Sequence, residues 1–455
     1  MASTKLTRTP SSQGNLKKWT YSMWVKLSGI NTEYVLFHNY GENTSREVYA
    51  KIGNNNGTIE FALKYDGSFD GRLITNRLFR DCSSFYHFVF VCDTENSTSG
   101  DRLKIYVNGV RETSFSTETY PPQNAGTVFN TTHEHTIGSY GSGNYFDGIM
   151  SHIHMTDGQA YDASTFGSTD STTGEWKINA DPGISQANYG TNGFWILKDG
   201  NSVTDQSGNS NNYAVGGGTL TNTEDCPSNN FTTMNPLQSR IASSGTAYPM
   251  SIYSNGNNKV ESSNTSAYTP SVGTLGTSSG KYYFECKMGA LGYTSFADTP
   301  CIGIKSLDTG LYDSAYDDTI RAYSIAGNKN IDGTATSFGN TFTTNDIIGV
   351  AMDLDNGAVY FSKNGTWENS GDPTSGSSKT GALATDMASY ENWSPFAMGY
   401  KGSAGDNSTF EFNFGNGVFG TTAISSEGTN ASGIGKFEYD VPTGYTALST
   451  KGLNE

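Results

Sequence analysis

Histidines are the residues of this chain whose spacing best suits metal chemistry. All six fall before residue 155, and four of them form two His-x-His pairs, His133 with His135 and His152 with His154. Side chains two residues apart project from one face of a strand, and paired imidazoles suit a transition metal. The same spacing also fits hydrogen-bonded polar positions on a sheet face, since zinc sites normally need three or four convergent ligands. Both interpretations stay open.

Carboxylates are the second candidate for chemistry. A retaining glycosidase needs two of them about 5 Å apart, which on a strand means acids alternating on one face, as in E-x-D-x-x-E. No such run occurs, and the closest stretch, "YFECKMG", supplies only Glu285. The glycine-rich "GSYGSGNYFDG" has no helix after it and predicts no nucleotide site. We therefore expect a protein that is not an enzyme.

A sequence segment that occurs twice predicts the strands that would position these residues. "RLKIYVNG" (102–109) and "GAVYFSKNG" (357–365) both alternate apolar and polar residues and end in Asn-Gly. Alternation with period two predicts a half-buried strand, and Asn-Gly is the strongest two-residue hairpin signal. An apolar run precedes each copy, "FYHFVFVCD" and "DIIGVAMDL". The pattern predicts one antiparallel meander written twice, in two β domains of related architecture.

Composition agrees with an all-β chain and excludes several classes of protein. The 455 residues include 54 Gly, 27 Tyr and 24 Phe, and short aromatic segments alternate with turn dipeptides, as in β-sandwiches. The net charge of −16 argues against binding to nucleic acid. No apolar run reaches the roughly 18 residues of a membrane span, and no apolar leader opens the chain. The five cysteines form no CxxC pair, which favours isolated buried thiols.

Residues 1–165 resemble a laminin-G-like jelly roll of the concanavalin A-like type. The matching segments are "SMWVKL", "FYHFVFVCD…LKIYVNG" and "YFDGIMSHIHMTDGQAYDASTFG". Residues 166–244 form a Gly/Ser/Asn-rich connecting segment, in which 194–197 is either a late strand on the first domain or part of a linker. Its "DQSGNSNNY" is similar to a turn that usually opens such a jelly roll, although here it follows the other motifs.

Residues 245–420 resemble a SPRY domain, itself a two-sheet sandwich. Five segments match in order: "GKYYFECKMG", "CIGIKS", "DIIGVAMDLDNGAVYFSKNGTW", "WSPFAMGY" and "STFEFNFG". Residues 421–455 form a C-terminal tail with a short strand-like stretch at 437–441. The predicted fold class is all-β, with two antiparallel jelly-roll β-sandwiches of concanavalin A-like type in tandem.

These resemblances imply two kinds of site. Laminin-G-like relatives bind Ca²⁺ through Asp and Asn side chains in loops, and the matching candidates here are Asp93, Asp101, Asn108 and Asp147. The alternative is turn chemistry, in which these side chains cap their own backbone. No cofactor is required, and calcium is a candidate.

In SPRY domains the loops at one end form the partner-binding surface. Aromatic residues in loop-like segments of the second domain are therefore candidate ligand contacts, because planar rings rimmed by short polar groups suit sugars or peptides. They are Tyr293, Tyr312, Tyr316, Tyr323 and Trp367.

The whole arrangement is similar to virion proteins of marine tailed phages, on "LTRTPSS…KKWTYSMWVK", "RLKIYVNGVRETSFSTETYPPQN", "YGTNGFWILKD…DQSGNSNNY" and "EYDVPTGYTAL". The resemblance implies a non-enzymatic protein of the virion, assembled in the host bacterial cytoplasm. Its expected partners are other virion proteins, a host cell-surface glycan or protein, and further copies of itself, with a trimer expected for a fibre. One hypothesis is a tail fibre or tail-tip adhesin, and the other is a capsid decoration or head-fibre protein.

Overall fold

The computed structural model describes residues 3–30, 33–41, 45–53, 57–198, 202–238, 240–241, 247–248, 251–262, 267–292, 299–308, 319–331, 333–389, 391–401 and 407–454. Strands make up nearly all of the regular structure in these ranges. The helices there are single turns: α1 (Gln186–Tyr189) and the 3₁₀ segments η1 (Ser99–Asp101), η2 (Ala163–Thr165), η3 (Glu368–Ser370), η4 (Gly376–Ser378), η5 (Met387–Ser389) and η6 (Gly452–Asn454). Among the described residues, no helix has the length and apolar character needed to cross a bilayer.

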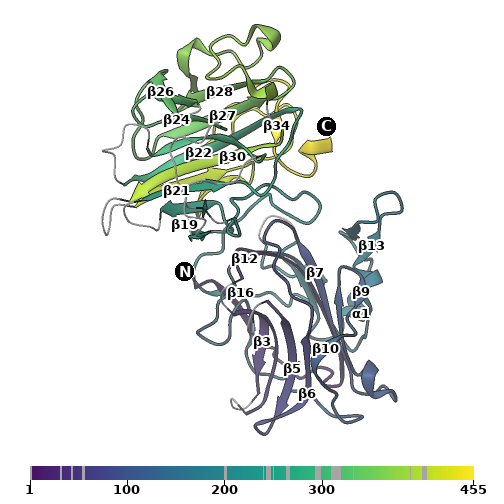
Figure 1. Cartoon of the computed structure of the whole chain (residues 1–455). Helices are drawn as coiled ribbons and strands as arrows, with labels where there is room; N and C mark the ends of the chain where they lie inside the picture. Colours follow the sequence, from purple (N-terminus) through teal and green to yellow (C-terminus); the bar gives the residue numbers. More distant parts are fainter. Residues whose placement is uncertain are drawn as a thin grey trace. The chain divides into compact units, whose positions relative to one another are not determined.

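The chain divides into two compact units, Met1–Thr221 and Asn222–Glu455. Strands dominate both units (Figure 1). The main sheets of each unit have eight and six strands, and each unit has an apolar core of its own. Neighbouring strands are antiparallel throughout, except for one short parallel pair in the second unit. The predicted all-β class with tandem concanavalin A-like sandwiches is therefore confirmed.

The first unit begins with β1 and closes with β16, which lie side by side. Its eight-stranded sheet has the order β10 (Phe115–Thr119), β6 (Ser68–Thr75), β5 (Ile59–Tyr65), β4 (Glu47–Ile52), β3 (Tyr34–Tyr40), β11 (His135–Ile137), β1 (Lys5–Arg8), β16 (Ala214–Gly217). The six-stranded sheet has the order β15 (Phe194–Ile196), β12 (Gly148–Asp157), β2 (Lys18–Leu27), β7 (Tyr86–Asp93), β8 (Leu103–Val107), β9 (Val110–Arg111). A separate hairpin joins β13 (Gly167–Thr169) to β14 (Trp176–Ile178).

The second unit repeats this layout. Its eight-stranded sheet runs β19 (Ser251–Ser254), β20 (Lys259–Ser262), β31 (Ser408–Asn413), β22 (Lys281–Leu291), β27 (Ile347–Asp353), β28 (Ala358–Lys363), β29 (Thr366–Trp367), with β34 (Thr446–Ala447) parallel to β22. Its six-stranded sheet runs β21 (Ala267–Val272), β30 (Trp393–Lys401), β23 (Cys301–Ser306), β24 (Ile320–Ser324), β25 (Asn328–Ile331), β26 (Thr334–Ser337). Two-residue strands pair as β17 (Arg240–Ile241) with β18 (Ala247–Tyr248) and β32 (Val418–Phe419) with β33 (Thr422–Ala423).

The repeated Asn-Gly phrase forms the same turn in both units. Asn108 and Asn364 have φ of 47° and 48°, and the glycines after them have φ of 84° and 79°, as a type I′ hairpin turn requires. Asn108 exchanges two hydrogen bonds with the backbone of His87, and Asn364 exchanges the same two with Ile347, all at 2.8–2.9 Å. The asparagine side chain thus ties each turn to the strand before the hairpin, which gives one physical reason for the repetition.

Strand β2 is buried on both faces, although its sequence alternates. One face enters the core of the first unit, and the other lies under the chain that follows β12. Phe166 and Ala163 of that covering segment pack on Val89 and Val91 of the neighbouring β7. A sheet covered on both sides needs apolar or hydrogen-bonded residues on both, so alternation is a poor guide to exposure here.

Residues 166–221 belong to the first unit. β15 pairs with β12 at one edge of the six-stranded sheet, and β16 pairs with β1 at the edge of the other. Phe194, Ile196 and Tyr213 enter the core. The division at Thr221 and Asn222 therefore falls inside the 166–244 segment that the sequence suggests as a connection.

The C-terminal segment packs on the outer face of the eight-stranded sheet of the second unit. Phe437 contacts Tyr283 there, with ring centroids 5.1 Å apart. The buried carboxylate of Glu285 accepts hydrogen bonds from the backbone N–H groups of Glu438 and Tyr439, at 2.9 and 2.8 Å. The predicted strand at 437–441 is wrong, because these N–H groups bond to a side chain and not to a neighbouring strand.

Candidate functional site

The first His-x-His pair is split between a core and a surface. His135 opens β11, is 2% exposed and stacks on Phe129 at 4.9 Å between ring centroids. Burial lowers the pKa of His135 to about 3, so the ring is neutral at physiological pH. His133 lies just outside the strand and lines a surface cleft. The structure therefore does not bring these two imidazoles to one face of a strand as a ligand pair.

The second pair is separated by a β-bulge. The pairing of β12 with β2 shifts register between Ser151 and His154, and His152 between them has a φ of +46°. Because a bulge breaks the alternation of side chains, the expected shared face is lost. His154 is buried, stacks on Trp195 at 4.9 Å, and its Nδ1 lies 2.9 Å from the Tyr189 hydroxyl. It is a core residue.

The calcium candidates lie at opposite ends of the six-stranded sheet. Asp93 and Asp101 flank the β7–β8 turn, where they form ion pairs with Lys18 at 3.7 Å and with Arg111 at 2.7 Å. Asn108 follows the other end of β8, and its side-chain oxygen is used by the His87 backbone.

Asp147 precedes β12 three strands away from β8, so the expected cluster of four oxygen ligands is not formed. Across the described ranges, no three His, Cys, Asp or Glu side chains converge as a metal site.

Of the five candidate aromatics, three lie outside the described residues: Tyr293, Tyr312 and Tyr316. Tyr323 was expected in a loop, but it lies in β24, is fully buried, and donates a hydrogen bond to the carbonyl of Asn340. The loop prediction for Tyr323 is wrong because the segment "IRAYS" is a strand, and this tyrosine faces the core. Trp367 is half-buried in β29 and packs edge-on against Tyr283.

Two glutamates that the sequence reading did not single out are buried on the outer face of the eight-stranded sheet of the first unit. Glu60 accepts hydrogen bonds from Arg72 at 2.7 Å and from the Tyr49 hydroxyl at 2.8 Å. Burial would raise the pKa of Glu60, but these bonds outweigh it and leave the pKa below its ordinary value. Glu60 is therefore an ionised carboxylate whose charge is balanced by neighbouring cations.

Glu47 is held in the same way but by other donors. Burial acts to raise its pKa, and the hydrogen bonds from His38, Tyr140 and Lys64 together bring it below the ordinary value. In the register of β4 with β5, Glu47 faces Lys64, whereas Glu60 faces Lys51. The two glutamates are thus four residues apart along the sheet, roughly 14 Å, which exceeds the separation that a glycosidase pair needs.

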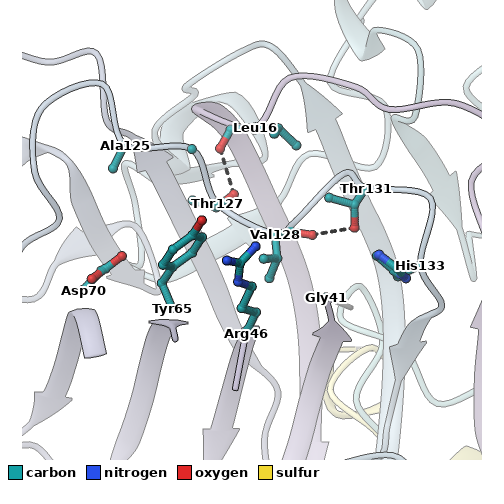
Figure 2. A pocket seen from close by; sticks show the side chains of 11 residues that line it. Leu16, Gly41, Arg46, Tyr65, Asp70, Ala125, Thr127, Val128, Thr131 and His133 are labelled. Carbon is teal, nitrogen blue, oxygen red and sulfur yellow. Dashed lines mark hydrogen bonds between the residues drawn. The ribbon is translucent and has the colours of Figure 1, made fainter. Parts of the chain in front are cut away.

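The cleft lined by His133 is the best candidate for a binding site. It has a volume of about 440 Å³ and lies at one end of the first sandwich, between the ends of the β3–β4 and β5–β6 hairpins and the chain from residue 125 to 133. Figure 2 shows Arg46 and Tyr65 next to each other at its centre, with Asp70 on one side and His133 on the other. Its lining residues are Leu16, Gly41, Arg46, Tyr65, Asp70, Ala125, Gly126, Thr127, Val128, Thr131 and His133.

A stacked cation and ring form the centre of the cleft. The guanidinium carbon of Arg46 lies 4.0 Å from the centroid of the Tyr65 ring, and its Nε donates to Asp66 at 2.9 Å. Asp66 and the glycine after it make the tight β5–β6 turn, whose N–H at residue 67 bonds to the Ser45 carbonyl at 2.9 Å. The turn therefore holds Arg46 in place while leaving Tyr65 39% exposed.

The chain from residue 125 to 133 presents hydroxyls to the cleft, and Asp70 of β6 presents a carboxylate. Thr127 and Thr131 donate to the carbonyls of Leu16 and Val128, both at 2.8 Å (Figure 2). The Thr127 hydroxyl also accepts from the Trp19 indole N–H at 3.4 Å, so the Thr131 hydroxyl is the better acceptor for a ligand. Within the described part of the chain, the Asp70 carboxylate has no hydrogen-bond donor or cation bonded to it. Burial and the neighbouring Asp66 raise the pKa of Asp70.

Sequence reasoning singled out only His133 of this group. The local signal for the rest was the "KYDGSFDG" turn, which places an exposed aromatic and two acids at a hairpin end. The approach of Arg46 and of residues 125–133 joins segments about 20 and 60 residues away, and no local pattern encodes it.

A family model and several solved structures match parts of this chain. Residues 2–164 match the family model described as the concanavalin A-like lectin/glucanases superfamily. Among solved structures, the SPRY domain of human HERC1 matches with a TM-score of 0.29 and 14% identity, over 39% of this chain and 96% of that chain. The heptameric SAP-like pentraxin from Limulus polyphemus matches with a TM-score of 0.27 and 13% identity, over 35% and 72%.

A third solved structure is domain 4 of AbnA, a GH43 extracellular arabinanase from Geobacillus stearothermophilus, in complex with arabinotriose. It matches with a TM-score of 0.26 and 16% identity, over 34% of this chain and 67% of that chain. No curated protein matches the sequence. Residues 2–164 therefore resemble a laminin-G-like jelly roll of the concanavalin A-like type, within a chain whose described regular structure is nearly all strand.

Proposed function

We propose that this chain is a non-catalytic glycan-binding protein, and that the cleft around Arg46, Tyr65 and Asp70 holds the sugar. The observation that carries the proposal is the meeting, in one cleft of about 440 Å³, of an exposed tyrosine ring, a guanidinium and an open carboxylate. Small-ligand sites typically have this size, with an apolar surface and a few convergent polar groups. A pyranose offers the complementary surfaces, an apolar face for the ring and hydroxyls for the charged groups.

Binding without catalysis is supported by the state of the buried acids. Glu47 and Glu60 lie on the outer face of the eight-stranded sheet, but each is neutralised by cations and has a pKa below its ordinary value. A general acid for glycoside cleavage needs a raised pKa and a second carboxylate within about 10 Å. These two glutamates therefore act as structural counter-ions on that face.

The proposal extends to where the protein works. The resemblance of the sequence to marine tailed-phage virion proteins supports a tail fibre or tail-tip adhesin that binds a host cell-surface glycan or protein. Such a protein would contact other virion proteins and assemble with copies of itself. The alternative is a decoration protein of the capsid, for which the net charge of −16 provides solubility as it does for an adhesin.

The first test compares two exposed aromatic side chains on one hairpin. Tyr65 and Phe69 are both 39% exposed and both carry an arginine over the ring, at 4.0 and 4.4 Å, yet only Tyr65 lines the cleft. Purified, labelled full-length protein is applied to an array of bacterial surface glycans and to host cells. We expect Tyr65→Ala to lower binding about tenfold, since loss of ring stacking typically costs about 1–2 kcal/mol, and Phe69→Ala to retain it. Equal binding by both variants, or no saturable binding at all, would reject the cleft as the glycan site.

A further inference from the structure

The surroundings of Asp70 indicate which class of sugar the cleft binds. We infer that its ligand is an N-acetylated amino sugar, whose amide N–H bonds to the Asp70 carboxylate and whose methyl group enters an apolar notch beside it. The inference rests on the proposed glycan-binding function and goes on to name the sugar class.

Asp70 supplies the first argument. It projects from β6 into the cleft, half-buried, and its neighbours among the described residues leave the carboxylate without a donor. Carboxylates bond most strongly to N–H and O–H donors when water is partly excluded. A sugar hydroxyl or a sugar amide could both supply the donor, so Asp70 alone narrows the ligand only to one with a donor at that position.

The notch supplies the second argument. Next to Asp70 the cleft continues as a pocket of about 10 Å³, lined on its apolar side by Val48, Leu63, Pro121 and Ala125. This volume is close to that of one water-sized group. The polar side chains of the lining are Lys64, Tyr65, Asp70 and Thr127. On the apolar side a hydroxyl would find no hydrogen-bond partner, whereas a methyl group gains apolar contact. An acetamide presents an N–H and, about 2.5 Å from the nitrogen, a methyl group.

Net charge supplies the third argument. The chain carries 44 acidic and 28 basic residues, a net charge of −16. Arg46 already bonds to Asp66, and Lys64, at the edge of the notch, bonds to Glu47 at 3.2 Å. A field of this sign repels acidic sugars, so uronic acids and sulfated sugars fit less well than a neutral acetamido sugar.

The ligand test uses three oligosaccharides with the same β-1,4-linked glucose backbone. Chitotriose carries acetamido groups, the fully deacetylated chitosan trimer carries free amines, and cellotriose carries hydroxyls. Isothermal titration of the full-length protein should give at least tenfold tighter binding of chitotriose than of either other trimer. Tighter binding of the deacetylated trimer would overturn the acetamide and point to an ammonium on Asp70. Equal affinities would overturn the inference while leaving glycan binding intact, and binding of no saccharide would overturn both proposals.

The protein variants separate the two contacts. Asp70→Asn keeps the shape but removes the charge, and should weaken chitotriose about tenfold and cellotriose by a smaller factor. Ala125→Leu narrows the notch and should remove the preference for chitotriose. Gln123→Leu makes the same kind of change on the exposed face of the same loop, where the side chain bonds only to the Glu95 carbonyl, and should change nothing. If both Asp70→Asn and Ala125→Leu still bind chitotriose more tightly than cellotriose, and their melting temperatures match that of the unaltered protein, the inference is contradicted.

Discussion

At the scale of single residues, the imidazoles of the first unit serve mainly to pack its aromatic layers. His87 lies between the rings of Trp24 and Trp176, with centroids 4.6 and 6.0 Å away. Its Nδ1 accepts a hydrogen bond from Trp176 Nε1 at 3.0 Å, and its Nε2 lies 2.9 Å from the Ser22 hydroxyl. A ring in this position has to be neutral, because a protonated Nδ1 would face the indole N–H donor.

This neutrality predicts acid lability of the first unit. Burial lowers the pKa of His87 and of His135 to about 3, below the value near 6.5 of an unfolded chain. A depressed folded pKa gives stability that is complete above pH 6.5 and is lost as the pH falls toward the folded value. For each ring, the free energy of unfolding should therefore fall by about 2 kcal/mol from pH 7 to pH 5. Urea denaturation at the two pH values measures this decrease.

Variants assign that loss to particular rings. His87→Gln keeps an acceptor for Trp176 but cannot be protonated, and should reduce the difference between pH 7 and pH 5 by about 2 kcal/mol. An unaltered pH dependence in His87→Gln would contradict the prediction, whatever the variant's stability at pH 7.

At the scale of elements, the β13–β14 hairpin is fixed to the six-stranded sheet by one tryptophan. Trp176 of β14 packs over the Asn-Gly turn after β8, so closely that a Cβ on Gly109 would lie 2.4 Å from its ring. A Cβ on Gly167, in the facing strand β13, would lie 2.6 Å from the same ring. The two glycines form a socket for the indole, and the sequence phrase "YVNG" therefore ends in Gly for packing as well as for turn geometry.

The socket predicts unequal effects of two similar substitutions. Gly109→Ala and Gly174→Ala both place alanine at positive φ, 84° and 74°, but only the Cβ at 109 meets a side chain, since nothing lies within 4 Å at 174. Gly174→Ala should cost the backbone strain alone, about 1–2 kcal/mol. Gly109→Ala should cost about 1–3 kcal/mol more through overpacking, with a shift in tryptophan fluorescence as Trp176 leaves the socket. Equal losses of unfolding free energy in the two variants would contradict the socket.

At the scale of the whole molecule, each unit is closed by chain that lies outside its recognisable motifs. The first unit takes β15 and β16 from the segment after residue 165, and the second holds residues 437–447 against its sheet through apolar contacts and Glu285. The family match stops at residue 164, about 60 residues before the unit ends.

Fragments test this closure. A fragment of residues 1–221 should unfold cooperatively in urea with fixed near-ultraviolet circular dichroism. A fragment of residues 1–165 lacks Phe194, Ile196 and Tyr213, each worth about 2 kcal/mol of apolar burial, and exposes the edges of β12 and β1. We expect it to be at least 5 kcal/mol less stable or to aggregate. Equal stability of the two fragments would show that the jelly roll is complete without these strands.

The sequence by itself determined the class of fold and the positions of the central hairpins. Period-two alternation and Asn-Gly turns are local signals, because the backbone of a strand or a type I′ turn depends on neighbouring residues. For this reason the predicted Asn-Gly turns after β8 and β28 are confirmed, and so are the strands predicted at β2, β22 and β27. The 437–441 stretch failed because its backbone bonds to Glu285, more than 150 residues away.

Tertiary structure alone decided the candidate site. Whether a histidine or a tyrosine is exposed depends on which segments cover its face, and the cover over His87, His154 and Tyr323 comes from chain distant in sequence. Likewise Arg46, Asp70 and His133 line one cleft only because β4, β6 and the chain from residue 125 to 133 come together at one end of the sandwich. Residue type and spacing indicate which side chains share the face of a regular strand. Bulges such as the one at His152, together with long-range burial, determine which of them reach a ligand.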